Sequence, residues 1–193
     1  MKELINKNKK FYKLTKFKKQ RSDLFFVTIP RENAPAFITY LRDYEKFTHL
    51  NFINAVDYIE NGIFQITYML QNNETFNNLG IRVEIPRENA EMTTIYHLWK
   101  AADVYERELK EMFGISFPGS PRQDQSFVLE GWEDIPPMRR DFDTLKYSNE
   151  TFFQRPGRTT HDPKTYMKEK LYPDADSKKL KTAEKPGRKD GKK

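Results

Sequence analysis

The stretch Val104-Tyr105-Glu106-Arg107-Glu108-Leu109-Lys110-Glu111-Met112-Phe113-Gly114-Ile115 is the most informative part of this sequence. Its apolar residues continue a series with spacings of three and four, which places them on one face of a helix. The series consists of Ile95, Leu98, Ala102, Tyr105, Leu109 and Met112. Gly114 can adopt the left-handed conformation that ends a helix, and Pro118 does not let the helix resume. The stretch therefore predicts the last turns of an amphipathic helix.

A second block, Pro137-Met138-Arg139-Arg140-Asp141-Phe142, follows after Phe113-Gly114-Ile115-Ser116-Phe117 and Trp132-Glu133. In this order and at this separation, the blocks resemble the 30 kDa subunit family of respiratory NADH dehydrogenase (complex I). Members of that family also serve membrane-bound hydrogenases and related ferredoxin-dependent complexes. The resemblance runs from about residue 50 to residue 142, and Asp57-Tyr58 matches the family's usual pair at a strand end.

The resemblance implies an α+β domain with a mixed β-sheet flanked by helices, followed by an extended C-terminal arm. It also implies a structural subunit in the hydrophilic arm of a membrane oxidoreductase, docked on the large hydrogenase-like subunit near a small iron–sulfur subunit. Iron–sulfur clusters, and nickel–iron or quinone sites, would belong to those partners. They would carry electrons from NADH or ferredoxin to quinone or protons and drive ion translocation. The chain itself would hold no cofactor and would be peripheral, at the cytoplasmic face of the cell membrane.

The residues that match the family's motifs are the expected partner-binding residues. They are Glu106, Arg107, Glu108, Glu111, Phe113, Gly114, Arg139, Arg140, Asp141 and Phe142. Two departures separate the chain from quinone-reducing relatives. Gly119-Ser120-Pro121 stands in place of the usual Gly-His-Pro, and Asp124-Gln125 stands in place of a basic pair. These departures favour a membrane-bound hydrogenase or a ferredoxin-linked complex over a standard NADH–quinone enzyme.

The charged residues of the predicted helix favour ion pairing over catalysis. Glu106 lies four residues before Lys110, so opposite charges meet on the helix surface, and the same holds for Arg107 and Glu111. Catalytic carboxylate pairs, as in glycosidases, face one another across a substrate cleft. Glu106 and Glu108 are two residues apart and point in different directions on a helix. We therefore assign no catalytic residue and expect intersubunit ion pairing, in which a buried arginine sets the register of the interface.

The composition excludes several kinds of site. A chain of 193 residues suffices for one globular domain with tails. The sequence has no cysteine, so disulfides and thiolate ligation of metal centres are excluded. Its three histidines, His49, His97 and His161, lie too far apart in sequence to predict a metal site. Phosphate-binding glycine motifs and apolar runs of membrane-spanning length are also missing, which predicts a soluble, cytoplasmic-side protein.

Basic residues gather at the two ends of the chain. Residues 1–21 hold nine Lys or Arg and one acid, and residues 174–193 hold eight and four. The alternative function is therefore a stand-alone basic module that binds RNA or an anionic membrane surface. For the basic segment 1–22 we favour an ordinary first helix or strand with solvated lysines. Nucleic acid is the least favoured partner, because the acidic middle of the chain would repel phosphate.

The domain itself is expected to span residues 23–142. Strands are predicted at 23–29, 47–58, 62–70 and 79–85, and a helix at 34–44 that Asn33 caps. Glu60-Asn61-Gly62 predicts a hairpin turn. The hexapeptide Ile29-Pro30-Arg31-Glu32-Asn33-Ala34 recurs at residues 85–90, each time after a strand and leading toward a helix. We interpret the repeat as one local solution used twice, not as a duplicated half-domain.

Beyond Phe142 the apolar pattern thins. Residues 143–173 hold scattered aromatic residues, including Phe152 and Phe153, between turn-forming prolines and glycines. Such a segment has too little periodicity for a core and is typical of an extended arm whose aromatic rings fill pockets of a partner. Residues 174–193 are expected to form a disordered basic tail.

Overall fold

A computed structural model describes residues 1–152 of the chain. Residues 1–144 form one compact unit, which contains the whole β-sheet. The strands are β1 (Thr15–Lys19), β2 (Leu24–Ile29), β3 (His49–Tyr58), β4 (Ile63–Asn72) and β5 (Asn77–Pro86). The helices are α1 (Lys2–Tyr12), α2 (Ala34–Tyr44), α3 (Ala102–Phe113) and α4 (Thr144–Thr151), with short 3₁₀ turns η1 (Arg31–Asn33) and η2 (Ile59–Asn61).

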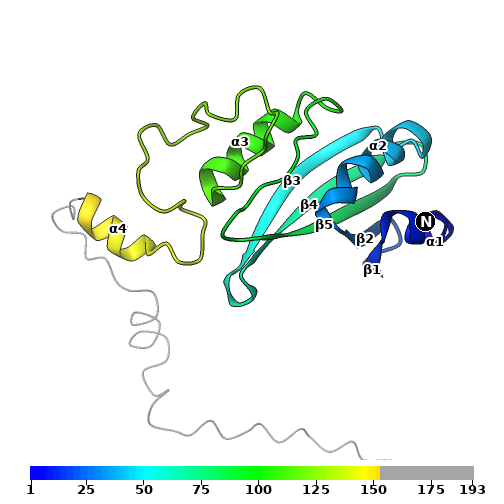
Figure 1. Cartoon of the computed structure of the whole chain (residues 1–193), viewed down its shortest axis with the longest axis horizontal. Helices are drawn as coiled ribbons and strands as arrows, with labels where there is room; N and C mark the ends of the chain where they lie inside the picture. Colours follow the sequence, from blue (N-terminus) through cyan, green and yellow to red (C-terminus); the bar gives the residue numbers. More distant parts are fainter. Residues whose placement is uncertain (153–193) are drawn as a thin grey trace, which may run out of the picture. The chain divides into compact units, whose positions relative to one another are not determined.

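The sheet is mixed, in the strand order β1-β2-β5-β4-β3. Strands β2 and β5 run parallel, while the other neighbouring pairs are antiparallel. Helix α2 lies across the sheet and α3 lies beside β3 (Figure 1). This arrangement confirms the predicted α+β domain with a mixed sheet. The predicted strands and the helix at 34–44 are also confirmed, with ends that move by up to two residues.

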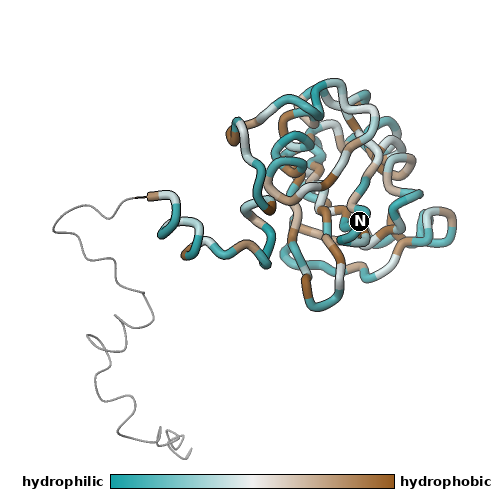
Figure 2. The backbone as a smooth tube through the Cα atoms, turned by 60° about the vertical axis from the view of Figure 1, so that its left-hand side comes forward, coloured by the Kyte–Doolittle hydropathy of each residue, from teal (hydrophilic) through white to brown (hydrophobic). Residues whose placement is uncertain are grey.

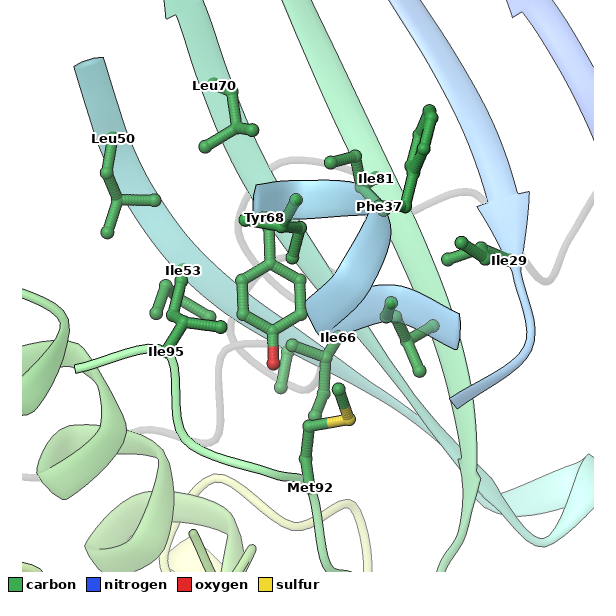
Figure 3. Packing of buried hydrophobic residues seen from close by; sticks show 14 of the residues in the cluster. Ile29, Phe37, Leu50, Ile53, Ile66, Tyr68, Leu70, Ile81, Met92 and Ile95 are labelled. Atoms are coloured by element: carbon green, nitrogen blue, oxygen red, sulfur yellow. The ribbon is translucent and has the colours of Figure 1, made fainter. Parts of the chain in front are cut away.

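The core lies between one face of the sheet and the helices. Hydrophobic and hydrophilic residues alternate along the backbone (Figure 2), as expected for strands with one buried face. Tyr68 of β4 is fully buried among Ile53 of β3, Phe37 of α2 and Ile95 of the segment before α3 (Figure 3). Phe64 makes an edge-to-face contact with Phe113 of α3 at 6.0 Å between ring centroids. Both helices therefore pack on the same face of the sheet.

The basic N-terminal residues contribute to this core. Ile5 of α1 and Leu14, which follows the helix, are each 2% exposed. The ring of Tyr12 lies 4.9 Å from that of Phe37. The lysines of α1 and β1 stay on the surface. Helix α1 is thus amphipathic with its apolar side against the domain, and β1 is a short, lysine-rich edge strand, a composition that discourages pairing with other chains.

Two local predictions were wrong. Helix α3 begins at Ala102, so Ile95 and Leu98 precede it and lie in a series of tight turns. In these turns the Leu98 N–H donates to the Ile95 carbonyl at 2.9 Å, a 3₁₀-type bond. Asn33 does not cap α2, because its side-chain amide donates instead to the carbonyl of Tyr12 at 3.2 Å. In both cases a contact made by a distant part of the chain overrides the local pattern.

The two copies of the repeated hexapeptide end their strands in the same way and then diverge. The first copy leads from β2 through η1 into α2. The second copy ends β5 and continues into turns, with α3 starting only at Ala102. The prediction that each copy leads toward a helix therefore holds directly for the first copy alone. Because no helix follows directly, side chains of the second copy contact other parts of the chain, as described below for Arg87.

Within the predicted arm, residues 144–151 form helix α4 and Phe152 is 64% exposed. The rest of the arm, including Phe153, and the predicted basic tail lie outside the described residues. No helix among residues 1–152 combines the length and the apolar character that crossing a membrane requires.

Candidate functional site

Glu106, the first carboxylate of the Glu-Arg-Glu motif, points into the protein and is 1% exposed. Its Oε2 accepts a hydrogen bond from the Thr94 hydroxyl at 2.7 Å, and its Oε1 accepts one from the Ile95 N–H at 2.9 Å. Burial raises the pKa of Glu106, with the nearby carboxyl of Asp103 acting in the same direction. Glu106 therefore anchors the turns before α3 to the helix.

Glu111, one turn further along α3, binds the backbone of a distant loop. Its two oxygens accept hydrogen bonds from three consecutive N–H groups, those of Phe127 at 2.7 Å, Val128 at 2.8 Å and Leu129 at 2.9 Å. Desolvation would raise the pKa of Glu111, but the three N–H donors together outweigh it and hold the pKa below its usual value. The carboxylate thus organises residues 127–129, which have no helix or strand of their own.

Arg107 also connects α3 to this loop. Its guanidinium donates to the Ser126 carbonyl at 3.2 Å and lies 5.8 Å from the ring centroid of Phe127. It is 3.5 Å from the fully buried carboxylate of Asp103, which also pairs with Arg122. The two ion pairs expected within the helix are replaced by these contacts, and Lys110 pairs with Asp124. The predicted Glu106–Lys110 pair was therefore wrong. The positive charge of Arg107 helps to lower the pKa of Glu111, as expected for helix neighbours of opposite charge, but the side-chain contacts of both residues are with the loop.

The C-terminus of α3 receives the second sequence block. Gly114 has a φ of 75° and closes the helix, as predicted. The guanidinium of Arg139 donates to the Phe113 carbonyl at 2.6 Å, and the Met138 N–H donates to the Met112 carbonyl at 3.0 Å. A Cβ atom on Gly114 would come within 2.8 Å of the Arg139 side chain. The positive φ of the cap favours glycine, and the absent side chain leaves room for the Arg139 guanidinium.

A charged network holds the remainder of this block against the sheet. Arg87 makes two hydrogen bonds to the carboxylate of Asp57, at 3.0 and 3.1 Å, and a third to Asp141 at 2.6 Å. The Arg140 N–H donates to Asp57 at 3.0 Å, and its guanidinium pairs with Glu60 at 2.5 Å. Contacts within the chain thus hold the second sequence block in two places. Arg139 bonds to the C-terminus of α3, and the Arg140 N–H bonds to Asp57 near the end of β3.

The loop that these contacts hold displays apolar side chains to solvent. Val128 is 65% exposed, Met138 58% and Ile135 42%; we call these three residues the loop surface. In the same loop the rings of Trp132 and Phe142 pack at 5.6 Å. A surface hollow of about 420 Å³ lies between α3 and this loop. The loop also carries four exposed acidic residues, Asp124, Glu130, Glu133 and Asp134.

Most of the predicted partner-binding residues make contacts within the chain. Arg107 and Glu111 hold the loop, and Glu106 holds the turns before α3. Arg139, Arg140 and Asp141 hold the second sequence block, and Phe113 is buried beside Gly114. Glu108 is half-buried on α3. Sequence patterns do not mark Asp103 and Arg122, and they mark Asp57 and Arg87 only as parts of the strand-end pair and of the repeated hexapeptide. Among residues 1–152 no group of three or more His, Asp or Glu could hold a metal ion.

Comparisons with known proteins place this arrangement in a family. The model of the family "Respiratory-chain NADH dehydrogenase, 30 Kd subunit" matches residues 27–148. The C-type subunit of NADH-quinone oxidoreductase from Moorella thermoacetica is 28% identical over 120 residues, which are 62% of this chain and 80% of that protein. The C/D-type subunit of the same enzyme from Phocaeicola vulgatus is 28% identical over 129 residues, 64% of this chain and 24% of that longer protein.

The fold has counterparts among solved structures. A chain of the membrane-bound sulfane sulfur reductase, an archaeal respiratory membrane complex, superposes with a TM-score of 0.70 at 23% identity. The match covers 82% of this chain and 98% of that one, which shows a common fold. Because the family model spans well over half of the sequence, the chain belongs to the 30 kDa subunit family of respiratory-chain NADH dehydrogenase, which supplies a non-catalytic subunit of complex I-like membrane complexes.

Proposed function

We propose that the chain is a structural and assembly subunit in the hydrophilic arm of a complex I-like membrane oxidoreductase, where it docks on the large hydrogenase-like subunit. The iron–sulfur clusters, and any nickel–iron or quinone site, belong to that subunit and to a small iron–sulfur subunit. Electrons come from NADH or ferredoxin, reduce quinone or protons, and drive ion translocation. The chain reaches the cytoplasmic face of the membrane through these partners.

The observation that carries this proposal is the loop held by α3. The segment between α3 and α4 contains no helix or strand. If its backbone were not held in place, it would lose much conformational entropy on binding. Glu111 and Arg107 order its backbone in advance, so the loop surface is already presented to a partner. Exposed apolar side chains in a loop that also carries exposed charged residues are typical of a protein–protein contact.

The relatives of the C/D type support the choice of partner. In the Phocaeicola vulgatus protein, the part that matches this chain makes up 24% of the length, so a C-type region and a further region share one polypeptide. Two regions fused in one relative and separate in another commonly contact one another. We infer that the D-type polypeptide is the large subunit on which this chain docks.

The loop surface can be tested in the assembled complex. We expect Val128→Glu and Met138→Glu to lower the amount of this protein that co-purifies with the large subunit by about 10-fold, since a charge would be buried at the contact. Phe11→Glu is the control, because Phe11 is also an exposed apolar residue but lies on α1, outside the loop. Equal recovery of all three variants with the parent would rule out docking through the loop surface.

A further inference from the structure

The repeated hexapeptide provides two arginines with the same neighbours and different surroundings. Arg31, in the first copy, is 43% exposed at its side chain and donates to the Glu91 carbonyl at 3.3 Å. Arg87, in the second copy, is 16% exposed and contacts two carboxylates. Because the local sequence is identical, the difference comes from what the rest of the fold brings to the second copy.

Arg87 joins three parts of the chain that are distant in sequence. Its own backbone N–H donates to the Gly62 carbonyl at 2.9 Å, next to the turn between β3 and β4. Its guanidinium holds Asp57, whose side chain is 1% exposed, at the end of β3. The same guanidinium reaches Asp141, whose side chain is 38% exposed. Planar, two-pronged contact of this kind fixes orientation as well as distance.

Residues 136–142, which we call the connecting segment, have no helix or strand. Their position depends on contacts at two sites. At one site Met138 and Arg139 bond to the C-terminus of α3, as described above. At the other site Asp141 and the Arg140 N–H bond to the Arg87–Asp57 pair. Met138 of the loop surface therefore belongs to a segment that is fixed at both sites.

We propose that Arg87 is a positioning residue for assembly: through Asp57 and Asp141 it holds the connecting segment so that the loop surface is ordered before the large subunit binds. This inference rests on the proposed docking function and assigns a role to a residue outside both family motif blocks. Arg87 itself stays between the sheet and the connecting segment. Its effect on affinity therefore comes from ordering, since a disordered segment would lose that entropy on binding.

The test has to separate ordering from global folding. Arg87→Met alone leaves the buried carboxylate of Asp57 unpaired, which is strongly destabilising. The double variant Asp57→Asn/Arg87→Met removes that charge and still lacks the bond to Asp141. Asp141→Asn weakens the same bond from the exposed side. Arg31→Met is the matched control, with the same sequence neighbours and a largely exposed side chain.

Two measurements on the full-length chain then decide the matter. Hydrogen exchange of the free protein reports on the Met138 and Arg140 amides, both of which are bonded in the connecting segment. We expect exchange about 10-fold faster or more at Met138 in both the double variant and Asp141→Asn, because a charge-assisted bond is lost. The Arg140 amide is read in Asp141→Asn alone, since its acceptor, Asp57, is replaced in the double variant. Affinity for the purified large subunit should fall by a similar factor. Arg31→Met should change neither quantity.

The outcomes separate this inference from the proposed function. Unchanged exchange at Met138 and Arg140 would overturn the ordering role of Arg87. Faster exchange with unchanged affinity would overturn its role in assembly and leave docking on the large subunit intact. A parent chain that does not bind the large subunit at all would overturn the proposed function, and the assembly role of Arg87 with it.

Discussion

Two glutamates of the same motif on α3 lie in different surroundings and make different contacts. Glu106 and Glu111 have the same side chain, yet the fold shifts their pKa values in opposite directions. Glu106 is buried and receives one hydroxyl and one N–H, so burial dominates. Glu111 is near the surface and receives three N–H groups, so hydrogen bonding dominates. A motif of acidic residues therefore need not act as one cluster.

The raised pKa of Glu106 leads to a prediction about stability and pH. A carboxyl whose pKa is higher in the folded than in the unfolded state stabilises the fold fully below its unfolded value, about 4.5 here. That contribution is lost as the pH rises through the folded pKa. Glu106→Gln keeps an acceptor for the Ile95 N–H but carries no charge. The free energy of unfolding of this variant relative to that of the parent should therefore increase from about pH 4.5 upward. Urea unfolding at several pH values measures this difference.

Glu106→Ala is the companion variant. It leaves the Ile95 N–H and the Thr94 hydroxyl buried without their acceptor, so we expect a loss of about 2–4 kcal/mol. A constant difference between Glu106→Gln and the parent across this pH range would mean that Glu106 does not carry a raised pKa.

At the scale of elements, the periodic patterns predicted β2 to β5, α2 and the end of α3, but not the short strand β1. Alternation in β5 and the Asn61-Gly62 turn depend on neighbouring residues alone, and these are correct. The start of α3 could not be predicted in this way. Ile95 continues the helical spacing, but its N–H is held by Glu106, eleven residues later, so the chain turns there instead.

The sequence motifs name several residues that lie at the candidate site, but they do not indicate the contacts of these residues, and the partner-binding role stays a prediction. The family motifs marked Glu111 and Arg139, while the backbone groups that they bind lie 16 and 26 residues away in sequence at the nearest. From the sequence, Asp103 resembles an ordinary surface residue of a polar helix. In the structure its side chain is fully buried and pairs with Arg107 and Arg122. The Asp103–Arg107 pair has the i,i+4 spacing of helix neighbours, but no spacing rule reveals the pair with Arg122, because it forms only when the loop folds back onto α3.

The bond between α3 and its loop can be measured through Glu111. Glu111→Ala removes the acceptor of three N–H groups, so the Val128 and Leu129 amides should exchange faster and stability at pH 7 should fall by about 1–3 kcal/mol. Because the pKa of Glu111 is lowered, this stabilisation exists above the unfolded value of about 4.5 and is lost as the pH falls through the folded pKa. The difference in the free energy of unfolding between Glu111→Ala and the parent should therefore become smaller as the pH is lowered.

Glu108→Ala serves as the control for that variant, since Glu108 is a half-buried carboxylate on the same helix. It should change stability by no more than about 0.5 kcal/mol. Equal effects of the two substitutions would show that helix propensity or net charge, and not the loop contact, is responsible.

For the whole molecule, the question is whether the basic N-terminal residues belong to the domain. A stand-alone basic module would use its lysines to bind an anionic surface and would need little from the apolar side of α1. The structure instead buries Ile5 and Leu14 in the common core. The net charge of +6 belongs to the whole sequence and predicts little about the fold of the domain.

Two substitutions on α1 distinguish these views. Ile5→Ala should lower the free energy of unfolding by about 2–4 kcal/mol, because it removes a buried side chain from a core that the sheet and α2 complete. Lys9→Ala, on the exposed side of the same helix, should change it by no more than about 0.5 kcal/mol. Thermal and urea unfolding of the full-length chain measure both values. If Ile5→Ala were as stable as the parent, α1 would be an appendage, and its lysines would again be candidates for an independent binding role.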